Sequence, residues 1–329
     1  MARIALDAMG GDHAPRAAIA GALLALAELP APHMIQLVGQ PAVIEAELTE
    51  LKADRSRLEI IPAADVIAMT DKPSVALRSK TNSMVVGLEL QPRGLSDAFV
   101  SAGNTGAQMA ASMKILKLMP GLERPAIGTL FPTALRAVLV LDSGANVDCS
   151  AEELLQFARL GSVYAEDLLG RSNPVIGLLS VGEEDEKGNG VVKEANALLR
   201  ASGLNFQGNV EGRDIPLGQS ERGPIDVVVC DGFVGNVLLK FYESIAPVVI
   251  RWIGEGLKMD AAQLRKGLSQ LDYSEHGGAP LLGVQGVSII SHGKSNDRAI
   301  KNAIKVALRA VESRMTEHAS RRLSESVSA

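Results

Sequence analysis

DVVVCDGFVGN, residues 226–236, is the stretch that best reveals the fold of the chain. Three consecutive valines at 227–229 run without polar alternation into an acidic residue and a glycine, and a helix-length amphipathic segment follows. Continuous runs of β-branched residues are typical of strands buried on both faces of a parallel sheet. We therefore expect a buried strand that passes into a helix through a glycine turn.

The same pattern recurs along the chain. The runs are RIALD (3–7), MIQLVG (34–39), RLEII (57–61), DAFVSAG (97–103), AVLVLDSG (137–144), PVIGLLSVG (174–182) and VSIISHG (287–293). Alternation of such runs with helical segments predicts a doubly wound α/β architecture. Ligands of open parallel sheets bind beyond the carboxyl ends of the strands. Polar residues stand at those ends here: Asp7, Ser101, Asp142, Ser180, Asp231 and His292.

Composition limits the classes of protein that the chain fits. Its 329 residues suffice for one large α/β domain or two lobes. The formal net charge of -5 argues against a nucleic-acid partner, because no excess of cations is present to neutralise phosphates. Two cysteines, Cys149 and Cys230, make no disulfide framework, and we expect buried thiols. No signal peptide precedes Asp7, and the longest apolar stretch, 17–27, is too short to span a bilayer. We expect a soluble protein that can still rest on a membrane surface.

Two helical regions stand apart from the strand pattern. Residues 242–272 carry two apolar faces at helical spacing, with one tryptophan and flanking basic residues. They predict a helical pair that packs in the core, forms a dimer seam, or touches lipid or a partner subunit. A terminal helix is expected up to Met315, and residues 319–329 are expected to form a flexible tail.

The first candidate site is SAGNTG, at the start of a predicted helix. A glycine-rich turn that enters a helix offers free backbone N–H groups and a positive dipole end, which together bind anions. A tight turn with a capping side chain explains the motif equally well. It is neither a P-loop nor a Rossmann fingerprint. Its candidate phosphate-binding residues are Ser101, Gly103, Asn104, Thr105 and Gly106.

Three further loops carry polar side chains beside glycines. DAMGGDHAP (7–15) places an acid/base candidate, His13, after glycines that let a ligand approach the backbone, and His292 lies in a similar loop. DSGANVD (142–148) and GFVGN (232–236) offer asparagine amides for a carbonyl or phosphate oxygen, although turn formation alone explains them too.

An acidic loop, GEEDEKGNG (182–190), contains one lysine, Lys187, followed by Asn189. Most runs of charged residues are solvated surface segments. A lysine flanked by glycines is nevertheless typical of a mobile loop that delivers a cation to a bound anion. No spacing of histidine, cysteine and carboxylate residues selects a metal, and no Ser/His/Asp triad is recognisable.

Eight segments carry a resemblance to one family. They are DAMGGDHAP (7–15), DAFVSAGNTGA (97–107), DSGANVDC (142–149), LLQFARLGSVYAE (154–166), NFQGNVEGRDI (205–215), DVVVCDGFVGNVLLK (226–240), LDYSEHGGAPLLGV (271–284) and SHGKSN (291–296). Together and in this order they resemble the phosphate acyltransferases of bacterial phospholipid synthesis. The stretch 216–227 is longer than in typical members, and the tail beyond Arg314 looks specific to this chain.

The resemblance implies a three-layer α/β fold like that of isocitrate and isopropylmalate dehydrogenases, with a protruding helical pair near 242–272. Residues 1–318 would form one two-lobed domain and a homodimer in the cytoplasm, without a metal or nucleotide cofactor. The helical pair would serve dimer contact and peripheral association with the membrane. Acyl carrier protein and inorganic phosphate would be the substrates, and a membrane glycerol-phosphate acyltransferase would consume the product.

Residue roles follow as hypotheses. Phosphate is assigned to the 101–106 turn with Lys187 and Asn189, and the thioester carbonyl to Asn146, Asn236 or the glycine amides of 232–235. His13 would meet the leaving sulfur, with His292 as the alternative. The acidic carrier protein needs a basic dock. Two sets offer one: Lys114, Lys117 and Arg124, or Arg251, Lys258, Arg265 and Lys266. The remaining substrate-binding candidates are Asp7, Gly10, Gly11, Asp142, Asp231 and Gly232.

Three rival functions remain open at this stage. A dehydrogenase of the same fold needs a dinucleotide site and a pair of metal-binding aspartates on one helix, and neither is found. A phosphotransacetylase that uses acyl-CoA is chemically closer, and the sequence separates it poorly from an enzyme that uses acyl carrier protein. A membrane-surface scaffold that recruits the carrier protein through 242–272 leaves the polar strand ends without a role.

Overall fold

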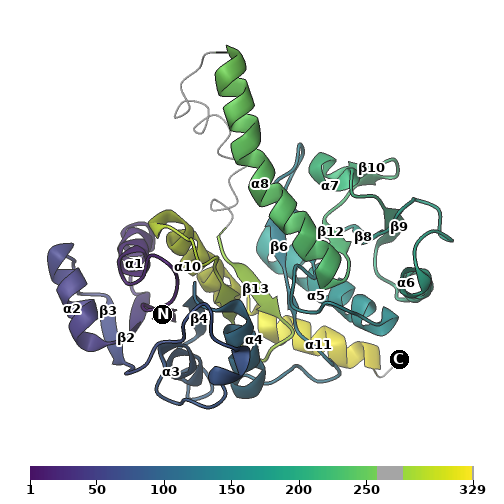
Figure 1. The fold of residues 1–329 in the computed structure, drawn as a ribbon. Helices are drawn as coiled ribbons and strands as arrows, with labels where there is room; N and C mark the ends of the chain where they lie inside the picture. Colours follow the sequence, from purple (N-terminus) through teal and green to yellow (C-terminus); the bar gives the residue numbers. More distant parts are fainter. Residues whose placement is uncertain (258–276, 328–329) are drawn as a thin grey trace. The chain divides into compact units, whose positions relative to one another are not determined.

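A computed structural model describes residues 1–257 and 277–327 of the chain. It divides into two compact units (Figure 1). Unit 1 comprises Met1–Pro125 and His276–Ala329, and unit 2 comprises Ala126–Glu275. Each unit has its own sheet, so each is described separately.

The sheet of unit 1 has the strand order β3-β2-β1-β4-β14-β13. All neighbours pair in parallel except β13, which is antiparallel to β14. Every residue of β4 is buried, as its continuous apolar run predicts. The bounds are β1 (Arg3–Asp7), β2 (Met34–Gly39), β3 (Leu58–Pro62), β4 (Ala98–Ser101), β13 (Ala279–Leu282) and β14 (Ser288–Ile290).

Helices cover both faces of this sheet. The first group, whose members pack on one another and on the strands, is α1 (Arg16–Glu28), α2 (Pro41–Glu50) and α10 (Asp297–Glu312). The second group is α3 (Ser83–Glu89) and α4 (Thr105–Ile115), which contact each other, with a short 3-10 turn, η1 (Pro73–Val75), against α4. Because α4 follows β4, it begins at the carboxyl edge of the sheet and ends at the amino edge.

The sheet of unit 2 has the order β6-β7-β12-β8-β9, and only β6 runs antiparallel to its neighbour. Its strands are β6 (Thr129–Phe131), β7 (Val138–Leu141), β8 (Ile176–Leu179), β9 (Phe206–Val210) and β12 (Val227–Val229). Two helices, α5 (Ala151–Leu169) and α6 (Gly190–Ala201), pack together against β7, β12, β8 and β9. The smaller elements are β5 (Ala126–Ile127), α7 (Asp214–Leu217), β10 (Gln219–Ser220) and β11 (Gly223–Pro224).

The longest helix, α8 (Gly232–Leu257), is mostly exposed. Leu238, Leu239 and Tyr242 pack against the core of the unit 2 sheet. By length and composition alone, Gly232–Gly256 would suffice to cross a bilayer. One side of the helix exposes a stripe of large apolar residues: Phe233, Val237, Phe241, Val248 and Trp252. The second half of the predicted helical pair, 258–272, lies outside the described residues.

The expectation of a flexible tail at 319–329 was wrong for the part that the structure describes. Residues Met315–Val327 form a further helix, α11, which contacts α10. Ala319 and Leu323 are 4% and 3% exposed. With Met315 they stand four residues apart, so they form one apolar stripe that packs inward.

Candidate active site

Three neighbouring strands of unit 1 end in polar residues that the fold brings together. Asp7, Ser101 and Ser291 follow or end β1, β4 and β14, which are adjacent and parallel. The Ser101 hydroxyl donates to the Asp7 carboxylate at 2.7 Å and accepts the Gly103 N–H at 3.0 Å. The Ser291 N–H donates to the Ser101 carbonyl at 2.8 Å. Ser101 and Asp7 are 0% and 2% exposed, so they hold the loops from beneath and do not face solvent.

Burial is the main influence on the Asp7 carboxyl and raises its pKa above the usual value. Hydrogen bonds from Ser101, Ser83 and the backbone at Met9 and Gly10 act in the opposite direction. The carboxyl therefore holds a proton more readily than an exposed aspartate does. The hydroxyl of Ser291, which the sequence analysis did not select, is buried and has no partner among the described residues.

The loop after β1 touches both other loops. A Cβ on Gly10 would lie 2.5 Å from the Asp7 carboxylate and 2.9 Å from the Gly103 nitrogen, so only glycine fits this contact. Gly11 has a φ of +103°. The Asp12 N–H donates to the Gly293 carbonyl at 2.7 Å. This bond joins the residues next to His13 and His292, so the two histidine-bearing loops meet.

The two histidines differ in their surroundings. His13 is exposed, and among the described residues it makes no side-chain hydrogen bond or ion pair. His292 is half-buried, and its Nδ1 accepts the Lys294 N–H at 3.2 Å. His13 is therefore the side chain that is free to meet a substrate.

The side-chain amide of Asn104 is engaged in contacts that hold the fold, and its assignment to phosphate stays a prediction. Its Oδ1 accepts the Ala107 N–H at 3.0 Å and caps α4, the capping role that the sequence analysis weighed as the alternative. Its Nδ2 donates to the carbonyls of Ala68, Met69 and Asp71. Thr105 is exposed and Gly106 half-buried at the start of the helix, and their anion-binding role stays a prediction.

Asp142 and Asn146 also hold the fold, and their assignment to substrate stays a prediction. Asp142 is 0% exposed, and its carboxylate accepts five hydrogen bonds. The donors are the backbone N–H groups of Ile127, Gly144, Ala145 and Asn146 and the side-chain amide of Asn146. Burial raises the pKa of this carboxyl, and those bonds oppose the shift. The loop after β7 is thus folded around its own aspartate.

The start of α8 packs against this loop. The Gly232 N–H donates to the Asn146 carbonyl at 2.7 Å, and a Cβ on Gly232 would lie 2.6 Å from the Asp142 carboxylate. Asp231 accepts the Val234 N–H at 2.8 Å, so it caps the first turn. Asn236 is exposed, and its side chain makes no hydrogen bond in the part of the chain that the structure describes. Its amide is therefore available to a ligand at the carboxyl edge.

Lys187 offers the matching cation at the same edge, because β8 and β12 are adjacent and parallel. The side chain is exposed and has no ion pair within residues 1–257 and 277–327. Asn189 caps α6 by accepting the Val192 N–H at 2.9 Å, which leaves only its amide hydrogens for a ligand. The Ser180 hydroxyl, one of the polar strand ends selected from the sequence, lies at the end of β8 and is buried without a partner in the described chain.

The described residues offer neither a metal-binding cluster nor a reactive thiolate. Among the described residues no group of three or more histidine, cysteine and carboxylate side chains is placed to hold a metal. Burial raises the pKa of Cys149 to about 12 and that of Cys230 well above its usual value, so neither thiol is a thiolate at neutral pH.

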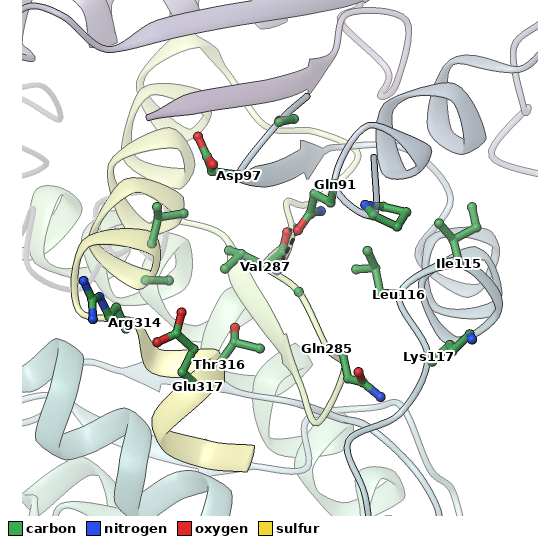
Figure 2. A pocket seen from close by; sticks show the side chains of 15 residues that line it. Gln91, Asp97, Ile115, Leu116, Lys117, Gln285, Val287, Arg314, Thr316 and Glu317 are labelled. Atoms are coloured by element: carbon green, nitrogen blue, oxygen red, sulfur yellow. Dashed lines mark hydrogen bonds between the residues drawn. The ribbon is translucent and has the colours of Figure 1, made fainter. Parts of the chain in front are cut away.

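A pocket of about 550 Å³ lies at the opposite edge of the unit 1 sheet (Figure 2). Asp97 and Val287, which precede β4 and β14, line it. The lining also includes Lys117, Arg314 and Glu317, so its cations and carboxylates balance. Because it opens at the amino ends of the strands, it is not part of the candidate active site.

Solved structures share the fold. A phosphotransacetylase from Streptococcus pyogenes aligns with a TM-score of 0.64 at 19% identity, covering 94% of each chain. A structure from Salmonella typhimurium described as a 4-hydroxythreonine-4-phosphate dehydrogenase aligns with a TM-score of 0.54 at 14% identity, covering 94% of this chain and 99% of the other. The chain is thus an α/β protein of the fold that phosphotransacetylases share with dehydrogenases, and the predicted fold class is confirmed.

Sequence comparison gives the family. The chain matches the family described as "Fatty acid synthesis protein" over residues 2–318. The phosphate acyltransferase of Heliobacterium modesticaldum is 50% identical over 323 residues, which cover 94% of each protein. The chain belongs to the phosphate acyltransferase family and is an acyltransferase, as its motifs predicted.

Proposed function

We propose that the chain transfers a fatty acyl group from acyl carrier protein to inorganic phosphate and releases acyl-phosphate for phospholipid synthesis. The observation that carries the proposal is Lys187, an exposed cation without an ion pair in the described chain, at the same sheet edge as the free amide of Asn236. One group attracts an anion and the other donates to an oxygen. Membership of the phosphate acyltransferase family supports the same chemistry.

The reaction needs no strong base, because phosphate is an anion at neutral pH. The enzyme has to remove water from phosphate, aim it at the thioester carbonyl and stabilise the oxyanion that forms. Lys187 binds phosphate and Asn236 donates to the oxyanion. When the carbon–sulfur bond breaks, the thiolate takes a proton from the solvent. In unit 1, considered by itself, Thr105 and Gly106 offer N–H groups to an anion.

The choice of donor separates this proposal from a transfer that uses coenzyme A. Turnover with palmitoyl-acyl carrier protein and with palmitoyl-CoA would be compared at saturating phosphate by following thiol release and acyl-phosphate. We expect a kcat/KM at least about 10-fold higher for the carrier-protein donor, because a protein dock adds binding energy that coenzyme A lacks. Equal or better turnover of palmitoyl-CoA would contradict the proposal.

The carrier protein docks, we propose, near the end of α8. The other predicted basic dock, which includes Lys114 and Lys117, is less accessible to a carrier protein. Lys114 donates to the Leu77 carbonyl at 2.9 Å, and Lys117 lines the pocket at the amino edge of the sheet. Arg251 is exposed and pairs with Glu255 at 2.8 Å, a weak surface pair that a partner can displace. Lys258, Arg265 and Lys266 lie outside the described residues. Arg251→Glu should raise KM for the carrier protein and leave KM for phosphate unchanged.

We also propose that the apolar stripe of α8 pairs two copies of the chain. Trp252, Phe241 and Phe233 are 65%, 59% and 61% exposed, and a second copy would cover a long stripe better than water does. Phe241→Glu should convert a dimer to a monomer in sedimentation, and an unchanged mass would contradict the pairing. We also propose that the protein is cytoplasmic and that the helical region 242–272 associates with the membrane surface. Flotation with anionic vesicles tests the membrane association.

A further inference from the structure

The loop that carries Lys187 is tied to its surroundings at three consecutive residues that precede the lysine. Glu183, Glu184 and Asp185 lie between β8 and the lysine, and each is held by a side chain from another element. The sequence analysis expected a mobile loop. The contacts describe a tethered one, from which the exposed Lys187 side chain projects without an ion pair in the described residues.

The central tether acts directly on the turn that ends at the lysine. The Glu184 carbonyl accepts the Lys187 N–H at 3.0 Å and the Asn209 side-chain amide at 2.7 Å. One oxygen thus links the backbone of Lys187 to Asn209, which belongs to β9. Loss of the amide donor would free the carbonyl around which the turn is built.

Asn209 is itself fixed. It is 1% exposed, and its Oδ1 accepts the side-chain amide of Asn196 at 2.9 Å. Asn196, on α6, is 3% exposed and also donates to the Asp185 carboxylate at 3.3 Å. Because the Asn209 oxygen is taken by Asn196, its nitrogen has to face Glu184. A buried amide pair of this kind holds one geometry, since each unmade bond would leave a polar group without water.

A second tether comes from Arg222. Its guanidinium donates to the Glu183 carbonyl at 3.0 Å and to the Gln207 carbonyl at 2.6 Å. It crosses Gly208, where any Cβ would overlap the guanidinium. Arg200 completes the set through an ion pair with Asp185.

We propose that Asn209 is a positioning residue of the reaction, which acts through the Glu184 carbonyl to aim Lys187 at phosphate. This inference rests on the proposed role of Lys187. A buried position on a strand does not by itself require an asparagine, because an apolar residue fits such a position better. Its amide is used instead to hold a surface loop.

The test is a double-mutant cycle between Asn209→Asp and Lys187→Ala, measured as KM and kcat for phosphate. Aspartate keeps the size of Asn209 and its acceptor for Asn196 but removes the donor to Glu184. We expect KM for phosphate to rise about 10-fold in Asn209→Asp, with a smaller change in kcat, because a displaced cation weakens binding of the anion. In the Lys187→Ala background the same substitution should add less than about 2-fold, because its effect passes through the lysine.

Asn205→Asp is the matched control. Asn205 precedes the same strand, and its amide also donates to a carbonyl, that of Asn173, at 2.9 Å, away from the Lys187 loop. It should leave phosphate kinetics unchanged. If Asn209→Asp fails to fold, Arg222→Ala replaces it, because Arg222 is exposed and holds the adjacent carbonyl.

The outcomes distinguish the proposed role of Lys187 from the positioning role of Asn209. If Lys187→Ala lowers activity but Asn209→Asp or Arg222→Ala leaves KM for phosphate unchanged, or if the two effects simply multiply, the positioning role is wrong. If Lys187→Ala itself leaves phosphate kinetics unchanged, the proposed role of the lysine fails first. The inference is established if Asn209→Asp raises KM for phosphate in the unmodified chain but causes no further rise in the Lys187→Ala background.

Discussion

The Ser101 hydroxyl donates a 2.7 Å hydrogen bond to the carboxylate of Asp7, which lies 94 positions earlier in the chain. Both side chains are buried, so this bond fastens the carboxyl ends of β4 and β1 to each other. It places the 7–15 loop, which carries the acid/base candidate His13, beside the 101–106 turn, the predicted anion-binding motif.

Ser101→Ala should therefore destabilise unit 1. The substitution removes one of the two side-chain donors to a buried carboxyl, and we expect a loss of about 1–3 kcal/mol in the free energy of unfolding. Urea denaturation followed by circular dichroism measures it. Ser244→Ala, at an exposed position on α8, should change the same quantity by less than about 0.5 kcal/mol. Equal effects of the two variants would show that the Ser101–Asp7 bond does not contribute measurably to the free energy of unfolding.

Lys187→Ala should raise KM for phosphate by about 10-fold to 100-fold, because one charge-assisted contact to the anion is lost. Lys187→Arg should recover part of the affinity, since the charge remains while the geometry changes. Initial rates at varied phosphate and fixed acyl donor measure both variants. Lys193→Ala, an exposed lysine on the neighbouring helix α6, is the control that should leave KM unchanged.

Asn236→Ala should lower kcat by about 100-fold with little change in KM for the acyl donor, because a donor to the oxyanion acts mainly in the transition state. Asn236→Asp should be slower still, since it brings a negative charge towards the oxyanion. Single-turnover rates with saturating phosphate separate the chemical step from product release. A variant with normal kcat and a raised KM would place Asn236 in substrate binding only.

The ion pairs between α1 and α10 predict a pH-dependent stability. Hydrogen bonds from Lys301 and Lys305 hold the pKa of the Glu28 carboxyl at about 2, below its usual value of 4.5. The stabilisation is therefore complete above pH 4.5 and is lost as the pH falls towards 2. Glu28→Gln should be less stable than the unmodified chain at neutral pH, and the difference should vanish at low pH and shrink in 1 M salt. Thermal melts across this range check it.

The strands were predictable because each central strand is a continuous apolar run, and burial on both faces leaves such runs few other structures. The helix α11 could also have been found, since Met315, Ala319 and Leu323 repeat every four residues. The flexible-tail expectation followed the polar composition of the segment instead of this spacing.

The candidate site was predictable in position but less so in role. Strand-end location selects Lys187, Asn236, Asp142 and Asn104 alike, and only the contacts separate the first two, which have free side chains, from the last two, which hold loops. Asn104 precedes a helix, so its capping role could have been given more weight. Asn209 carries no sequence signal, because its importance depends on the Glu184 carbonyl that lies 25 positions away.

The most direct test of the account is thiol release from palmitoyl-acyl carrier protein by the pure protein, with and without phosphate, while hydroxylamine traps any acyl-phosphate. The account predicts release that depends on phosphate and yields palmitoyl hydroxamate in equal amount to the free thiol. Release that is independent of phosphate, or no release from a folded protein, would contradict the proposed transfer.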